Sequence, residues 1–447
     1  MKKLFFLKGL VLISLVGLAQ DTTHTYDVLT LKQSVEIAIA NNATVKTSEF
    51  AKDYSGVNYT LAKGNFIPQL SGNINHSLNQ GRGINTSTNT YINSSFTSAG
   101  YSLTSQATLF NGLYYLNTLK KSKYAYDATN MDWQQAKDNL TLQVILAYLQ
   151  MLTSTDLLEQ ARRQADVTKQ QVDRLETMNK EGAIKPSDLS DLKGQYAGDE
   201  LAYISAQNAL DQARYTLSQL MNVPYNKNLK VEQIGADQFD LNYGSAPDTI
   251  YQSALQQLAI VKAADLRTKA FDREVKAAKG LLYPSLGLGA GISTNFSSLA
   301  TDANNNKIGY SNQLQNNYGT YLSAGIFIPL LNNLRYRGQI ASAKIDYKSA
   351  KFTAQTTRIQ LKQNIEKDYF DMTASMERYK ATAEQVDAYT ESFRAANLRF
   401  TEGVGSVVEY LIAKNNLDRS KTNLIVGRYD YLLRTKILDY YQSKPLW

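Results

Sequence analysis

The sequence has no cysteine, only two histidines and only seven prolines among its 447 residues. Without cysteine the chain cannot form a disulfide, a thiolate metal site or a lipidated N-terminal cysteine. His24 and His76 alone provide little for a histidine zinc site or a serine–histidine triad. Neither a GxxxxGK(S/T) nor an HExxH motif occurs. We therefore expect no enzyme, no cofactor and no metal site.

Long apolar runs are missing as well. Beyond residue 19 no stretch of 18 consecutive apolar residues occurs, so no membrane-spanning helix is expected. Residues 1–19 differ from the rest, because lysines flank a short apolar run that ends in small residues before Gln20. The run is too short to span a bilayer of roughly 30 Å. It predicts a secretory signal peptide, and hence an exported protein.

The charge is mildly positive. The full chain has a net charge of +8, from 48 basic and 40 acidic residues. The signal segment contains Lys2, Lys3 and Lys8, so the remainder carries 45 basic residues against 40 acidic ones, a net charge of +5. These charges are interpreted as scattered over helical faces rather than gathered in a patch. We therefore do not expect nucleic-acid binding.

The sequence repeats itself. Early residues recur at a separation of 216 and later ones at 221, so one length difference, between about 80 and 99, explains the change. Matched pairs include Ala38 with Ala254, Pro68 with Pro284, Asn111 with Asn332, Tyr126 with Tyr347, and Gly182 with Gly403. The predicted division is a first repeat over 20–222, a connecting segment over 223–246 and a second repeat over 247–447.

Two long segments, 113–178 and 335–401, contain no proline. Each can form one helix, which at 1.5 Å per residue is a rod of roughly 100 Å. Apolar residues along them alternate steps of three and four, the 3.5-residue period of a coiled coil. Turns near Gly182 and Gly403 then lead into further heptad-spaced segments. Long helical hairpins are predicted over about 113–221 and 335–441.

Ahead of each rod the apolar period changes from 3.5 to 2. Strand pairs are predicted over about 66–109 and 283–330, each with one apolar and one small polar face. The segments between the strands, 80–98 and 298–317, are rich in Asn, Ser, Thr and Gly and are predicted to be exposed loops. Strands of this length match the roughly 9 to 11 residues of a transmembrane β-strand.

Four strands are too few to close a barrel. An open sheet is not stable in lipid, because the N–H and C=O groups of its edge strands have no water to hydrogen-bond. Single-chain barrels begin at about eight strands, so several copies of the chain are expected to share one barrel. The small polar face is then expected to line its lumen. The predicted lumen residues are Gln69, Ser71, Asn73, Thr104, Gln106 and Ser285.

With these features the sequence resembles the outer-membrane efflux protein (TolC-like) family over essentially the whole mature chain. The resemblance rests on three segments taken in order. They are the opening helix SVEIAIANN at 34–42, the strand entry FIPQLSG at 66–72, and the hairpin tip RFTEGVGSVVEYL at 399–411.

The resemblance implies a mostly α-helical protein with a membrane β-barrel, built from a duplicated unit of helical hairpin and β-hairpin. It implies a homotrimer whose twelve-stranded barrel spans the outer membrane of a Gram-negative bacterium and continues as an α-helical periplasmic tunnel. It also implies a passive exit duct of a tripartite efflux pump or type I secretion system. The implied partners are a periplasmic adaptor (membrane fusion) protein, an inner-membrane transporter of the RND or ABC type, and outer-membrane lipid.

Two residue sets near the hairpin tips are candidates for function. Small residues would let an adaptor hairpin approach closely, although the tip glycines can equally serve only to shape the turns. The charges near the second tip are of both signs rather than purely acidic. The adaptor-contact candidates are Gly182, Ala183, Ser187, Gly403, Val404 and Ser406, and the gate candidates are Arg394, Arg399, Glu402 and Glu409. A periplasmic adaptor and a coiled-coil surface adhesin remain the alternative functions.

Overall fold

A computed structural model describes residues 28–85, 89–234 and 243–447. The predicted signal peptide and mature N-terminus lie outside these residues. The first half contains β1 (Val28–Leu29), α1 (Leu31–Asn41), α2 (Ala43–Gly64), β2 (Gln69–Asn79), β3 (Arg82–Asn85), β4 (Thr90–Asn93), β5 (Phe96–Asn111), α3 (Tyr114–Lys180) and α4 (Pro186–Met221). Next come β6 (Lys230–Val231), α5 (Pro247–Gln257), α6 (Ala259–Gly280), β7 (Ser285–Ser297), α7 (Tyr310–Asn316), β8 (Gly319–Phe327), α8 (Arg335–Thr401) and α9 (Val407–Tyr441).

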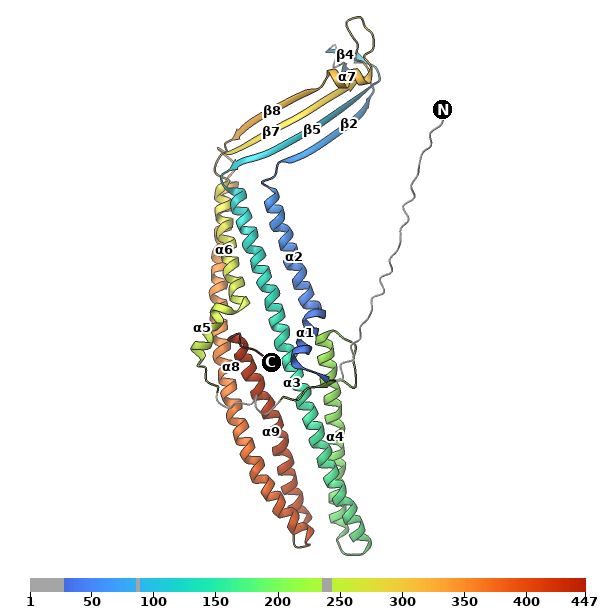
Figure 1. Ribbon diagram of the computed structural model, residues 1–447, viewed down its shortest axis with the longest axis vertical. Helices are drawn as coiled ribbons and strands as arrows, with labels where there is room; N and C mark the ends of the chain where they lie inside the picture. The colour runs from blue at the N-terminus through green and yellow to red at the C-terminus, as the bar shows by residue number, and fades with distance from the viewer. Residues whose placement is uncertain (1–27, 86–88, 235–242) are drawn as a thin grey trace, which may run out of the picture.

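The molecule is elongated, with a four-stranded sheet above a wall of helices (Figure 1). The sheet order is β2-β5-β7-β8, and every neighbouring pair is antiparallel. Below it α2, α3, α6 and α8 lie side by side, and α4 and α9 pair with the lower halves of α3 and α8. Among the described residues no helix is both long and apolar enough to cross a membrane.

The two halves are built alike. Both α3 and α8 have 67 residues, close to the predicted rods, and both α2 and α6 have 22. Each long helix follows a strand through two left-handed residues, Gly112 and Leu113 before α3 and Asn333 and Leu334 before α8. Left-handed leucine is uncommon and costs free energy, so its presence at both junctions indicates a tightly specified bend.

Glycine permits a close contact at the first junction. A Cβ on Gly280, at the end of α6, would lie 2.6 Å from the carbonyl oxygen of Gly112. Such a separation is far below van der Waals contact, so any side chain here would push α6 away from the start of α3. This contact fixes neighbouring helices where the sheet begins.

Three apolar clusters hold the wall together. The largest joins α1, α3, α4 and α9 around buried Tyr148 and Leu217. A second, around Ile250 and Ile365, attaches α5 to α8 and α9. The third, around Leu192 and Tyr410, packs the two hairpins against each other near their tips.

The predicted loops contain regular structure. A two-stranded hairpin, β3 with β4, occupies part of 80–98, and α7 lies within 298–317. The α7 helix is short and is held by polar contacts. The buried Gln313 side chain accepts a hydrogen bond from the Ser297 amide of β7 and donates one to the Ser297 carbonyl. These elements lack the apolar periodicity that makes helices and strands visible in a sequence. The connecting segment includes β6, which pairs in parallel with β1.

Candidate functional site

The sheet has one small polar face. In an antiparallel pair, residues directly opposite each other share a face, and Gln69 pairs with Gln106 and Ser71 with Thr104. The hydroxyl groups of Ser71 and Thr104 are 2.9 Å apart. The same face continues across β5 to glycines of β7, and on β8 it includes two large side chains, Tyr321 and Phe327. The structure thus brings all six predicted lumen residues, Gln69, Ser71, Asn73, Thr104, Gln106 and Ser285, onto one face.

The opposite face is mostly apolar, and its polar members are His76, Thr97, Ser105, Thr294 and Thr320. It alternates with the polar face as predicted, except at Leu109, where a bulge between Thr108 and Phe110 shifts the register. No Asp, Glu, Lys or Arg occurs in these strands. The aliphatic residues of this face are Leu70, Ile74, Leu78, Leu103, Leu286, Leu288, Ile292, Leu322 and Ile326.

Aromatic side chains mark both ends of the apolar face. Phe296 packs on Tyr310 at the loop end, with ring centroids 4.8 Å apart, and Phe110 pairs opposite Leu286 at the helical end. Ten residues of β7 separate these levels, roughly 33 Å at 3.3 Å per residue. At a strand tilt of about 40° that is a band about 25 Å tall, which matches the lipid-facing band of outer-membrane barrels.

Both hairpin tips are glycine turns. Gly182 has a φ of 72° and Gly403 a φ of 75°, in the left-handed region. The Ala183 amide donates to the Met178 carbonyl, and the Val404 amide donates to the Arg399 carbonyl, which closes the ends of α3 and α8. The turn-shaping interpretation of these glycines therefore holds. Adaptor contact stays a prediction, and a Cβ at either glycine would meet nothing within 4 Å.

The two tips enclose a cavity of about 470 Å³. Four adaptor-contact candidates line it, namely Gly182, Ala183, Gly403 and Ser406, whereas Ser187 and Val404 do not. Arg174 of α3 donates to the Thr401 carbonyl of α8 at 2.7 Å, a contact that joins the tips beside the cavity. The tips of one chain therefore form a single composite surface.

The gate candidates form contacts within one hairpin. Arg399 pairs with Glu409 across the α8–α9 turn at 2.7 Å, and Arg394 pairs with Glu391 on its own helix at 2.6 Å. Glu402 takes part in no ion pair among the described residues. These side chains are exposed, and exposed pairs contribute about 0–1 kcal/mol. In a single chain they brace the second hairpin and do not join it to the first.

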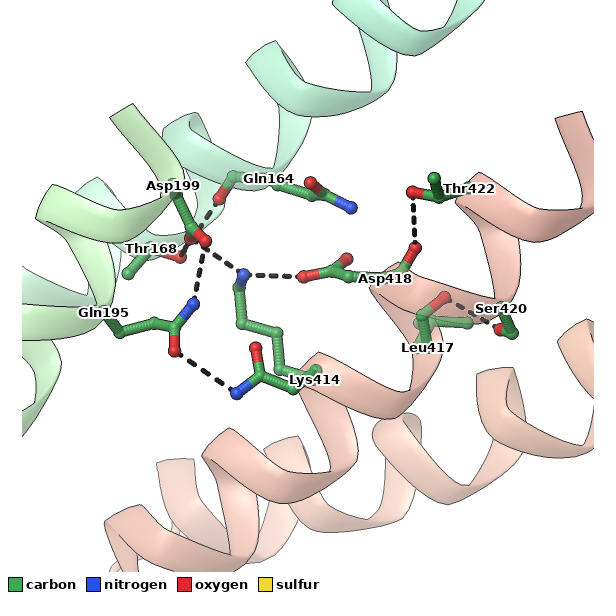
Figure 2. A network of polar contacts seen from close by, with 10 residues as sticks. Gln164, Thr168, Gln195, Asp199, Lys414, Leu417, Asp418, Ser420 and Thr422 are labelled. Carbon is green, nitrogen blue, oxygen red and sulfur yellow. Dashed lines mark hydrogen bonds and ion pairs between the residues drawn. The ribbon is translucent and has the colours of Figure 1, made fainter. Parts of the chain in front are cut away.

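A buried charged cluster that was not predicted from the sequence joins the hairpins (Figure 2). The Lys414 ammonium of α9, in a residue only 2% exposed, lies 2.9 Å from the Asp199 carboxylate of α4 and 2.7 Å from that of Asp418. Asp199 also accepts hydrogen bonds from Thr168 of α3 and Gln195 of α4. We refer to Lys414, Asp199 and Asp418 as the clasp.

The clasp leaves one negative charge in excess, because two carboxylates share one ammonium. Burial is the largest cause that raises the pKa of the Asp418 carboxyl above its ordinary value of 3.8, the Asp199 charge adds to the rise, and Lys414 opposes it. The charged and titratable groups around Asp418 are Lys414, Asp199 and Tyr410. The signal in the sequence was that Asp199 and Lys414 occupy coiled-coil seam positions, seven residues from Leu192 and Val407.

Acidification should strengthen the fold through Asp418. A carboxyl whose folded pKa is raised contributes stability below its unfolded pKa, and this contribution is lost as the pH rises through the folded pKa. Between the raised pKa and about 3.8, wild type is expected to gain stability on acidification relative to Asp418→Asn. Thermal unfolding of both proteins across this pH window measures the difference between their stabilities. The contributions of carboxyls that both proteins contain cancel in this difference. A constant difference would contradict the prediction.

The chain thus joins a sheet with one mostly apolar face to a wall of long helices. The family model described as "Outer membrane efflux protein" matches residues 35–223 and 250–438. The chain is 23% identical over 439 residues to outer membrane protein TolC of Escherichia coli (strain K12), covering 97% of this chain and 85% of that protein.

Solved structures share the fold. The outer membrane protein VceC from Vibrio cholerae matches with a TM-score of 0.77 at 16% identity, over 92% of this chain and 94% of that one. The Campylobacter jejuni CmeC outer membrane channel matches with a TM-score of 0.76 at 15% identity, over 93% and 87%.

The chain belongs to the outer membrane efflux protein family. It is an outer-membrane exit duct for efflux in a Gram-negative bacterium, as the resemblance implied. The match favours this function over the alternatives of a periplasmic adaptor or a surface adhesin. The family is one of conduits rather than catalysts.

Proposed function

We propose that three copies of this chain close into a twelve-stranded barrel and a twelve-helix tunnel that conduct cargo passively to the exterior. The observation that carries the proposal is the pair of open sheet edges, β2 and β8. With four antiparallel strands, β2 and β8 run in opposite directions. The β8 edge of one copy can therefore pair antiparallel with β2 of the next, as in known membrane barrels.

The two sheet faces support the same arrangement. With the apolar face toward lipid, the uncharged face with Gln69, Ser71 and Thr104 lines the bore. Such a wall offers hydrogen bonds to water but no charge to hold or repel cargo. Barrel conduction is then expected to depend little on the sign of the cargo's charge.

The helical wall also has two unpartnered edges. On α2, exposed apolar residues follow steps of four and three, and on α8 they follow steps of seven. These are Phe50, Tyr54, Val57 and Leu61 on α2, with Ile345, Phe352 and Ile359 on α8. A stripe on each outer edge of the wall is suited to packing α8 of one copy against α2 of the next.

The repeat supplies a template for that contact. Because α2 corresponds to α6 and α3 to α8, the α3–α6 contact inside one chain predicts the α8–α2 contact between chains. Inside the chain, Lys121 of α3 pairs with Glu274 of α6 at 2.7 Å. The offsets of 221 and 216 carry this pair to Ser342 and Asn58, both exposed in a single chain.

A cysteine pair tests the assembly, since the chain has no cysteine of its own. With Asn58→Cys and Ser342→Cys in one chain, a short bismaleimide is expected to produce covalent dimers and trimers but nothing larger. The matched pair Lys121→Cys and Glu274→Cys should cross-link only within a chain and run as a monomer. Products that stop at dimers, or that extend beyond trimers, would contradict a closed ring of three.

We further propose that the composite tip surface receives a periplasmic adaptor, and that an RND or ABC transporter in the inner membrane supplies the energy, for drug efflux or type I secretion. The cavity between Gly182 and Gly403 and the open space within 4 Å of a Cβ at either glycine support close approach of a helical hairpin. Gate roles for Arg394, Arg399, Glu402 and Glu409 require contacts between copies at the closed end of the tunnel.

A further inference from the structure

A basic stripe runs along the upper part of the wall on α6 and α8. On α8 its cations recur at intervals of three, four or seven residues, and on α6 they do the same, which places each set on one helical face. The members are Arg337, Lys344, Lys348, Lys351, Arg358 and Lys362 on α8, with Lys262, Lys269, Arg273 and Lys276 on α6. The fold thus gathers charges that looked scattered in the sequence.

The two sets face the same side of the wall. Arg358 forms an ion pair with Asp265 across the α6–α8 groove. Asp265 lies between Lys262 and Lys269 on its own face, three and four residues away. Arg358 stands seven residues from Lys351 on its face. The ion pair therefore joins the two columns at one side of the groove.

Most of the stripe is unneutralised. Only Arg358, Lys276 and Lys362 pair with carboxylates, those of Asp265, Asp272 and Glu366. The other seven cations have no ion pair among the described residues, so the stripe carries a net charge of +7. The whole mature chain carries only +5, which leaves the remainder slightly negative. This is a concentrated field rather than an average surface.

The stripe faces outward in the proposed ring. The Lys362 ammonium lies 6.0 Å from the centre of the Tyr251 ring on α5, so α5 covers the same side. An additional helix on the inner side would obstruct the bore, and α5 therefore marks the outside. Only this outward orientation of the stripe depends on the proposed ring; the position of the stripe on α6 and α8 does not.

Lipid headgroups cannot cover the stripe. Thr268 of α6 contacts Ala350 of α8, which sets Lys269 level with Lys348 and Lys351. These residues lie about 20–25 Å below the start of α8 at 1.5 Å per residue. The headgroup layer is only about 5–8 Å thick. Anionic lipid would reach Arg337, at the top, and little else.

We propose that the basic stripe is a docking surface for an acidic helix of a periplasmic protein. Along α8, Lys344, Lys348 and Lys351 are spaced by about 6 and 4.5 Å, and along the antiparallel α6, Lys269, Arg273 and Lys276 have the same spacings in the opposite direction. Carboxylates at i, i+4 and i+7 of another helix have this same spacing. A helix laid along the groove can therefore meet cations from both columns over several turns.

The probes are two fluorescent helical peptides of equal composition, one with glutamates along a single face and one with them distributed around the helix. Purified full-length protein in neutral detergent is expected to bind the first at least tenfold more tightly. The triple variant Lys269→Glu, Lys348→Glu, Lys351→Glu should lose this binding. The control variant Lys169→Glu, Lys227→Glu, Lys230→Glu reverses three exposed lysines elsewhere and should retain it.

Three outcomes would overturn the proposal. They are equal binding of both peptides, binding that survives the triple reversal, and protection of Lys269, Lys348 and Lys351 from acetylation by phosphatidylglycerol nanodiscs without peptide. The last outcome would assign the stripe to a lipid surface instead. Because the Asn58–Ser342 cross-link measures ring assembly independently, failure here leaves the proposed duct standing.

Discussion

A chain carrying Phe352→Asp together with Ile359→Asp is expected to stay monomeric and to conduct no current across a planar bilayer. Both side chains are exposed in the single chain, Phe352 at 70%, on the stripe proposed to meet α2 of the next copy. Losing their burial costs about 1.5–3 kcal/mol each, and burying a carboxylate costs several kcal/mol more. Each 1.4 kcal/mol is about a factor of ten in affinity, so assembly should fail.

The control for this prediction is Gln355→Asp with Gln360→Asp. It adds the same charge to the same helix at two exposed positions whose counterparts in α3, Gln134 and Asn139, stay exposed next to α6, and it should leave the trimer and its conductance intact. Size-exclusion chromatography with light scattering measures the oligomeric state, and single-channel recording measures the current. Trimers of normal conductance from the Phe352 and Ile359 variant would remove α8 from the interface between copies.

Periodicity made the architecture visible in the sequence. The rods were predicted to within about two residues because coiled-coil spacing extends over many turns and no proline interrupts them. The strand faces were predicted because successive side chains of a strand point to opposite faces of the sheet, so each residue can lie on only one of two faces. Leu109 departs from the pattern because a bulge inserts one residue, and a bulge has no signature in alternation.

Features that depend on contacts between distant segments were not predicted. Asp199 and Lys414 are 215 residues apart, and their pairing follows only once α4 and α9 pack together. The basic stripe was hidden for a related reason, since α6 and α8 are separated by a strand pair and become neighbours through the sheet. The short α7 was missed because its few residues contain no repeat of an apolar pattern.

The clasp should matter more for stability than any exposed ion pair in the chain. Lys414→Ala leaves the carboxylates of Asp199 and Asp418 buried without a cation, and removing one partner of a buried pair costs about 3–5 kcal/mol. The loss should fall on the contact between the hairpins, because the clasp links α4 to α9. Guanidinium unfolding followed by circular dichroism measures the change in the free energy of unfolding.

Two further variants isolate the electrostatic cause. Lys421→Ala removes a lysine from the same helix, seven residues on, that has no ion pair among the described residues, and should cost under about 1 kcal/mol. Lys414→Met combined with Asp199→Leu and Asp418→Leu removes all three charges and should recover part of the loss, since apolar replacement of a buried ion pair is often neutral. If Lys414→Ala costs no more than Lys421→Ala, the ammonium is solvated and the hairpins are held by apolar packing around Tyr410 instead.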